Sequence, residues 1–140
     1  INRIVGVFPP YQQRQVRLQL SAILKGVVSQ RLVPCAEGKG RVPAVEVMVS
    51  TARVRELIDD KEKTKLLRDT IQNGYETYGM QTFDQSLMRL LNNELITYEE
   101  ALRQSSNPDD FKLKMSGISS TSDLTWDHFN KDEDSDEETP

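Results

Sequence analysis

Two apolar runs separated by a short turn place the strongest limit on how this chain can fold. Val27–Pro34 and Val42–Val49 are rich in β-branched residues, and the segment between them contains Gly38 and Gly40. Two such runs joined by a short glycine-bearing loop are typical of an antiparallel hairpin. Both runs carry apolar residues on both faces, and a two-stranded hairpin is marginal by itself. We therefore expect an α/β domain in which chain upstream of residue 1 supplies a larger sheet.

The hairpin carries two charged residues that could pair across the strands. If the turn centres on Gly38–Lys39, Arg31 lies opposite Glu46, the one charged residue of the second run. A cross-strand ion pair between Arg31 and Glu46 is the simpler interpretation. A contact of Glu46 with a ligand or another subunit is the alternative.

The segments on either side of the hairpin have helical periodicity. Apolar residues at helical spacing predict an amphipathic helix from Tyr11 to about Lys25, after the break at Pro9–Pro10. Everything after Ser50 is also helical in pattern, and it predicts a small helical bundle. The signals are the apolar sets Val16, Leu20, Ile23, Leu24; Val54, Leu57, Ile58; and Leu66, Leu67, Ile71, the stop at Asn73–Gly74, the capping boxes Thr82/Gln85 and Thr97/Glu100, and the N-cap Asn107 before Pro108.

The net charge of −4 is an average over two different regions. Residues 121–140 hold eight acids and one base, whereas the rest of the chain is mildly basic. Such a polar, acidic stretch buries too little apolar surface to offset its ordering entropy, so we predict that residues 116–140 are disordered. Leu124, Trp126 and Phe129 are its apolar exceptions. The simpler interpretation is chance or weak packing on the body, and the alternative is a short docking motif flanked by acids.

Several functional classes are disfavoured by what the chain lacks. A single cysteine, Cys35, and a single histidine, His128, exclude an internal disulfide, a multi-cysteine zinc site and a histidine-dependent catalytic triad. No apolar run is long enough to span a membrane, and the basic residues lack the aromatic platform typical of nucleic-acid binding. Gly38–Gly40 fails the phosphate-loop pattern. We assign no catalytic, cofactor-binding or metal residue, and the first residue, Ile1 rather than Met, predicts a fragment.

Six ordered blocks of the sequence carry a family likeness that extends from residue 1 to about residue 111. Taken together, they resemble the C-terminal part of the PilT-type ATPases, the twitching-motility motors of the secretion ATPase superfamily that retract type IV pili. The blocks are Phe8–Pro10, Val16–Leu20, Ser29–Pro34, Gly40–Met48, Thr51–Ile58 and Gly79–Leu87.

The resemblance implies both a fold and an activity. Residues 1–50 would form the end of a RecA-like ATPase core, 51–115 a C-terminal helical subdomain, and 116–140 the acidic tail. The longer protein would bind ATP and magnesium, assemble as a homohexameric ring, and act on an inner-membrane pilus platform protein from the cytoplasmic side. The phosphate loop and the catalytic boxes of the family lie upstream, so this chain is expected to be inactive alone.

One family motif, associated with retraction, aligns with residues 53–60. Arg55, Leu57 and Ile58 match it, Val54 is a mild change, and Asp60 keeps its acidic character; elsewhere, notably at Asp59 in place of an arginine, the chain departs from it. The simpler alternative is a short amphipathic helix with an i,i+4 pair between Arg55 and Asp59.

Two other functions remain open from the sequence. One is a non-enzymatic helical interaction module. The other is a fragment of a different secretion-superfamily ATPase, including a paralogue of the PilU type. The single cysteine cannot build the four-cysteine zinc module common in the assembly motors, which favours the retraction branch.

Overall fold

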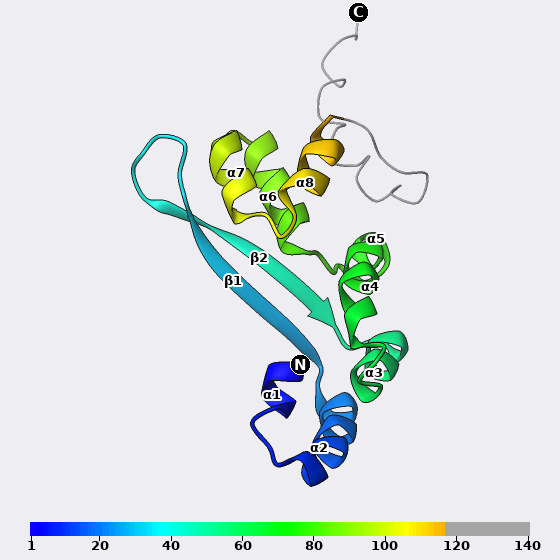
Figure 1. Cartoon of the computed structure of the whole chain (residues 1–140). Helices are drawn as coiled ribbons and strands as arrows, with labels where there is room; N and C mark the ends of the chain where they lie inside the picture. Colours follow the sequence, from blue (N-terminus) through cyan, green and yellow to red (C-terminus); the bar gives the residue numbers. More distant parts are fainter. Residues whose placement is uncertain (117–140) are drawn as a thin grey trace, which may run out of the picture. The chain divides into compact units, whose positions relative to one another are not determined.

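A computed structural model describes residues 1–116 of the chain as a mixed α/β fold with one antiparallel hairpin (Figure 1). This confirms the predicted class. The predicted acidic tail, with Leu124, Trp126 and Phe129, lies outside the described residues. The elements are α1 (Asn2–Val5), α2 (Pro10–Ile23), β1 (Gly26–Pro34), β2 (Arg41–Val49), α3 (Ala52–Asp59), the 3-10 turn η1 (Thr64–Leu66), α4 (Leu67–Asn73), α5 (Tyr75–Tyr78), α6 (Phe83–Asn92), α7 (Tyr98–Gln104) and α8 (Pro108–Met115).

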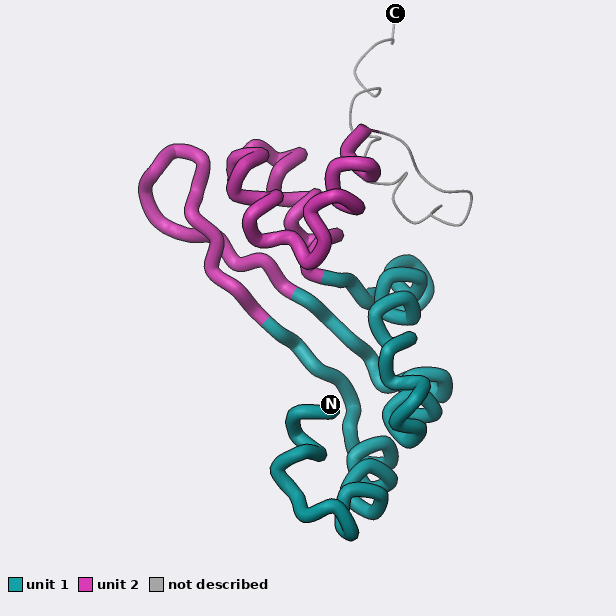
Figure 2. Tube along the Cα trace, viewed as in Figure 1, with its two compact units in different colours: residues 1–29, 46–82 teal, residues 30–45, 83–140 magenta. Residues whose placement is uncertain are grey.

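The chain divides into two compact units, and the hairpin contributes to both (Figure 2). Unit 1 contains residues 1–29 and 46–82, and unit 2 contains residues 30–45 together with the chain from 83 onward. Each unit has its own hydrophobic core. The predicted domain boundaries at residues 50 and 115 refer to a longer protein and stay a prediction.

The register of the hairpin is fixed by hydrogen bonds at its two ends. The Ser50 N–H donates to the Lys25 carbonyl at 2.9 Å, and the Cys35 N–H donates to the Gly40 carbonyl at 3.3 Å. Facing residues therefore have numbers that add to the same total at both ends. Gly40 has φ of 80°, a left-handed conformation that favours glycine.

This register differs by two residues from the predicted one. Arg31 lies opposite Ala44, and Glu46 lies opposite Ser29, because the turn centres one residue earlier than we assumed. Arg31 instead places its guanidinium over the Phe83 ring, 4.4 Å from the centroid, and donates to the Gln104 carbonyl at 3.1 Å. An ion pair between Arg31 and Glu46 stays a prediction.

The core of unit 1 lies where α3 and α4 meet the base of the hairpin. Its β2 strand is extended by an isolated antiparallel bridge between Val47 and Gln81, with N···O distances of 2.8 and 3.0 Å. The α2 face differs from prediction in one respect, because Ile23 is 70 % exposed whereas Arg17 is buried. The buried core residues are Met48, Val54, Ile58, Ile71 and Met80, with Leu20, Leu24 and Val27 packed against them.

The core of unit 2 is built by α6, α7 and α8 against the distal part of the hairpin. The predicted caps are confirmed in part: the Thr97 and Asn107 side chains accept hydrogen bonds from the N–H groups of Glu100 and Asp110. The Glu100 carboxylate binds Arg103 and Gln104. The buried residues are Val33, Ala44, Leu87, Met88, Leu90, Ile96, Ala101 and Phe111.

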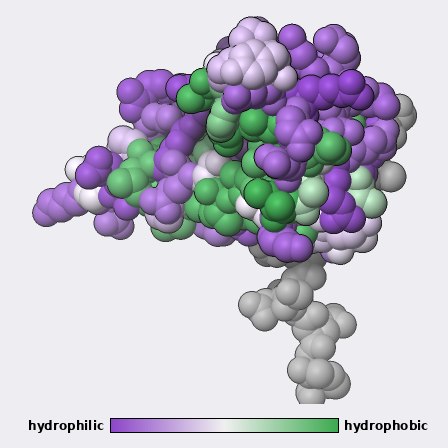
Figure 3. Space-filling view, turned by 90° about the horizontal axis from the view of Figure 1, so that it is seen from below, coloured by the Kyte–Doolittle hydropathy of each residue, from purple (hydrophilic) through white to green (hydrophobic). Residues whose placement is uncertain are grey.

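Strand β1 carries exposed apolar side chains in both units. Val28 in unit 1 is 72 % exposed, and Leu32 in unit 2 is 48 % exposed. Apolar side chains are also visible among polar ones at the surface of the space-filling view (Figure 3).

Among residues 1–116, no helix has the length and apolar character needed to cross a bilayer.

Candidate functional site on helix α3

Helix α3 is the element that carries the predicted retraction motif. Its first turn is capped by Thr51, whose side-chain oxygen accepts a hydrogen bond from the Val54 N–H at 3.2 Å. Val54, Leu57 and Ile58 are completely buried because their spacing places them on one helical face. The predicted short helix is confirmed, and these three motif residues hold α3 in the core.

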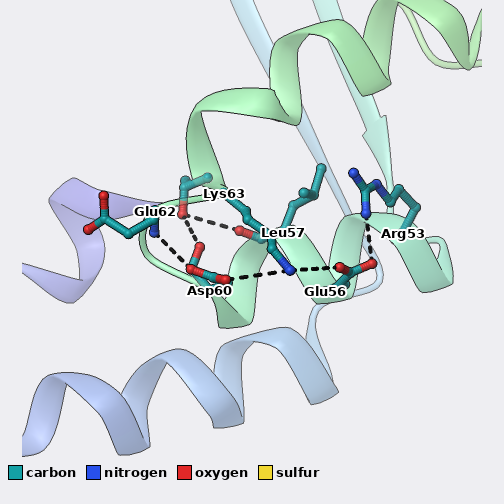
Figure 4. A network of polar contacts seen from close by, with 7 residues as sticks. Arg53, Glu56, Leu57, Asp60, Glu62 and Lys63 are labelled. Atoms are coloured by element: carbon teal, nitrogen blue, oxygen red, sulfur yellow. Dashed lines mark hydrogen bonds and ion pairs between the residues drawn. The ribbon is translucent and has the colours of Figure 1, made fainter.

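The outward side of α3 carries a chain of ion pairs with the loop that follows it (Figure 4). The Glu56 carboxylate accepts from Arg53 Nη1 at 2.8 Å and from Lys63 Nζ at 3.1 Å. Lys63 Nζ also lies 3.6 Å from an oxygen of Asp60. Because all four side chains are exposed, each pair contributes little stability. The network instead orders the charges that α3 presents.

The predicted pair between Arg55 and Asp59 is absent from the described residues. Arg55 Nη1 donates to the Ser50 carbonyl at 3.1 Å, so its side chain folds back toward the start of the helix. Asp59 is exposed and lines two surface cavities. Arg55 is therefore the exposed basic residue of the matching motif positions.

Asp60 shapes the turn at the end of α3. Its backbone N–H donates to the Glu56 carbonyl at 3.2 Å, and its Oδ1 accepts from the Glu62 N–H at 2.9 Å. The Thr64 hydroxyl donates to the Asp60 carbonyl at 3.0 Å. An acid at this position thus has a local structural role in addition to its place in the motif.

Arg17 on α2 positions the end of α3, and sequence reasoning missed it. It is 6 % exposed, and its guanidinium donates to the Ile58 carbonyl at 2.8 Å, the Thr64 hydroxyl at 2.9 Å and the Asn2 side-chain oxygen at 2.6 Å. The available signal was helical phase, since Arg17 lies three residues before Leu20, which packs against the core. Because Arg17 is charged, the pattern of apolar residues did not mark its position on α2 as buried.

The local electrostatics of Glu56 give a testable pH effect. Hydrogen bonds from Lys63 and then Arg53 hold the pKa of Glu56 below its ordinary value. The stabilisation from this carboxylate is therefore present above the unfolded pKa of about 4.3 and is lost as the pH falls through the lower folded pKa. Carboxyl-detected NMR titration of Lys63→Met should show the pKa of Glu56 rising toward its ordinary value.

Glu100 serves as the internal control for this titration. Its pKa is also lowered, by a hydrogen bond from Arg103, and it belongs to unit 2. The Lys63→Met change should leave the pKa of Glu100 where it is. An unchanged pKa for Glu56 in the variant would show that the network of Figure 4 does not form in solution.

Comparison with known proteins identifies the relatives of this fold. The chain is 39 % identical over 111 residues to PilT, the type IV pilus retraction ATPase of Pseudomonas aeruginosa, covering 79 % of this chain and 31 % of that protein. It is 39 % identical over 113 residues to the type IV pilus ATPase PilU of the same organism, covering 81 % and 29 %. A twitching motility protein of Neisseria gonorrhoeae is 38 % identical over 109 residues. The chain belongs to the PilT-type family.

Solved structures agree with this assignment. The crystal structure of the pilus retraction motor PilT with bound ADP matches 78 % of this chain with a TM-score of 0.59 and 40 % identity. The ATPase DotB of Yersinia pseudotuberculosis has the same TM-score at 19 % identity, which shows a shared fold alone. No family model matches the chain. The chain spans about three tenths of the length of the curated PilT-type relatives.

Proposed function

We propose that this chain supplies the C-terminal portion of a type IV pilus motor ATPase that powers pilus retraction and twitching motility. The observation that carries the proposal is the agreement of sequence and fold with PilT, at 39 % identity to the P. aeruginosa protein and a TM-score of 0.59 to the crystal structure of a PilT motor. In the longer protein, ATP and magnesium would drive the motion, and the ring would be a homohexamer. Its partner would be a platform protein at the inner membrane, contacted from the cytoplasmic side.

The architecture of the hairpin supports a role as part of a larger ATPase domain. The 140 residues contain no phosphate-loop pattern. Val28 and Leu32, each an exposed apolar side chain of β1, are suited to cover by further chain, as a RecA-like sheet would require. We therefore infer that the nucleotide site lies in another part of the motor and that this chain alone does not turn over ATP.

The exposed side of α3 is the proposed contact for force transmission. Val54, Leu57 and Ile58 are buried and unavailable to a partner, whereas Arg55 of the same helix is exposed. An exposed arginine on a short, firmly packed helix is well suited to bind a carboxylate of a partner. In this account α3 couples the motor to its target and takes no part in ATP chemistry.

A chimaera tests the proposal. In it, this chain replaces the matching segment of P. aeruginosa PilT, and it is introduced into a strain that lacks PilT. We expect Arg55→Ala in the chimaera to reduce twitching zones at least severalfold while purified protein keeps its ATP turnover. The matched control is Lys65→Ala, an exposed base of η1 outside the motif.

The two readouts separate the possible outcomes. Loss of twitching with ATP turnover intact supports a coupling role for Arg55. Normal twitching with Arg55→Ala would remove that role, and equal loss with Lys65→Ala would show a non-specific effect of surface charge.

PilU-type function is the second candidate, and it rests on a specific observation. The identity to PilU equals the identity to PilT, at 39 % over similar lengths. The same replacement made in PilU, and tested in a strain that lacks PilU, distinguishes the two. Twitching restored in the strain without PilT but not in the strain without PilU would assign the chain to the PilT type, and the reverse result would assign it to the PilU type.

A further inference from the structure

A charged cavity of about 300 Å³ lies in unit 1 beside the C-terminal end of α3. Residues of α1, α2 and α3 line it, together with the loop after α3. Its charged lining consists of three bases, Arg14, Arg17 and Lys61, and one acid, Asp59. The cavity therefore has an excess of two positive charges.

The buried base of this set has no acidic partner in the described part of the chain. Arg17 is 6 % exposed, and its three acceptors are neutral: the Ile58 carbonyl, the Thr64 hydroxyl and the Asn2 amide oxygen. Burying a charged group is costly unless other groups compensate it. Within residues 1–116, no acidic side chain offsets the guanidinium of Arg17 at the wall of the cavity.

The remaining charged side chains at the cavity are exposed and available. Within residues 1–116, Arg14, Lys61 and Asp59 have no side-chain hydrogen bond or ion pair. Arg14 offers a planar fork of donors that suits a phosphate, and Lys61 offers a mobile point charge. Neither cation is committed to holding the fold together.

We propose that this cavity binds a phosphate group, either as free phosphate or as the phosphate ester of a small molecule. Phosphate is mostly a dianion above pH 7, and two negative charges match the excess of two positive charges at the cavity. A single carboxylate would leave half of that excess uncompensated. The proposal does not rest on the motor function, and the site is separate from any phosphate-loop sequence.

Calorimetric titration of the 140-residue chain tests the proposal at pH 7.5 and constant ionic strength. One arm uses inorganic phosphate and the other phenyl phosphate, which distinguishes a free anion from an ester. We expect saturable binding that weakens at least about fivefold in Arg14→Gln and in Lys61→Gln. Asp59→Asn should tighten binding, because it removes the one acid of the lining.

The control variant is Lys25→Gln, which removes an exposed base of unit 1 that does not line the cavity. It should bind phosphate as the parent does. Circular dichroism confirms that each variant is folded, and Arg17 is left unchanged because the fold depends on it. If Arg14→Gln did not fold, the direction in which Asp59→Asn changes the phosphate affinity would still test the proposal.

In the phosphate titrations, three results would overturn the proposal. They are binding that does not saturate, equal weakening in Lys25→Gln, and no tightening in Asp59→Asn. Displacement of phosphate by an acidic peptide at lower concentration would assign the cavity to a carboxylate of a protein partner instead.

Discussion

Replacing Arg17 by methionine should lower the free energy of unfolding by about 3 kcal/mol, although the change keeps an unbranched side chain. The guanidinium satisfies three oxygens on three separate segments, at Ile58, Thr64 and Asn2. Methionine leaves all three without their donor. The bond to the Ile58 carbonyl is buried and those to Thr64 and Asn2 are partly buried. A buried acceptor that loses a charged donor carries the full cost of its desolvation, so the Ile58 carbonyl should account for most of the loss.

Arg14→Met is the matched control for this change, since Arg14 lies on the same helix and is exposed. It should alter the free energy of unfolding by less than about 0.5 kcal/mol. Chemical denaturation followed by circular dichroism measures both variants. Equal free energies of unfolding for Arg17→Met and Arg14→Met would contradict the buried hydrogen bond between Arg17 and the end of α3.

Phe111→Ala should destabilise unit 2 by about 3–5 kcal/mol, the range for a buried aromatic side chain cut back to alanine. Phe111 is 1 % exposed and is among the largest fully buried side chains of residues 1–116. It joins α8 to the core formed by α6 and α7. The loss combines the transfer of apolar surface with the cavity left behind.

Leu113→Ala on the same helix serves as the comparison, because Leu113 is 51 % exposed. It removes a large apolar side chain without opening a core cavity, so its effect should be under about 1 kcal/mol. Hydrogen exchange of the α6 amides reports on the core directly. Similar protection in Phe111→Ala and in the unchanged chain would show that α8 does not pack as described.

Much of the fold followed from apolar spacing and capping residues. The spacing of Val54, Leu57 and Ile58 placed the buried face of α3 correctly, because helical periodicity determines which side chains share a face. Asn107 before Pro108 also marked the start of α8, where the Asn107 side chain accepts from a backbone N–H. Helical periodicity and N-cap residues involve only residues close together in the chain, so they can be recognised from a single sequence.

The features that escaped prediction depend on contacts between distant segments. The hairpin turn lies one residue earlier than assumed, which moves Glu46 from its predicted place opposite Arg31 to a place opposite Ser29. A turn of this length allows more than one register, and packing on the helices selects among them.

Buried polar residues were the second source of error. Residues 81 and 82 and 84–86 are polar yet buried. The Ser86 hydroxyl accepts from the Val45 N–H at 3.0 Å, and the Asp84 carboxylate accepts from the Ser106 N–H at 2.9 Å. The polar atoms of Ser86 and Asp84 thus form hydrogen bonds with backbone groups of other segments, as the guanidinium of Arg17 does with the Ile58 carbonyl. A pattern of apolar and polar residues cannot distinguish such side chains from solvated ones.

Twitching motility of the unsubstituted chimaera tests the central claim most directly. This chain replaces the matching segment of P. aeruginosa PilT in a strain without PilT, and an inactive form that lacks the hairpin, residues 26–49, is the comparison. The account predicts twitching zones well above those of the hairpin-deleted form, together with magnesium-dependent ATP turnover by the purified chimaera. A folded chimaera that hydrolyses ATP and gives no more twitching than the hairpin-deleted form would contradict it.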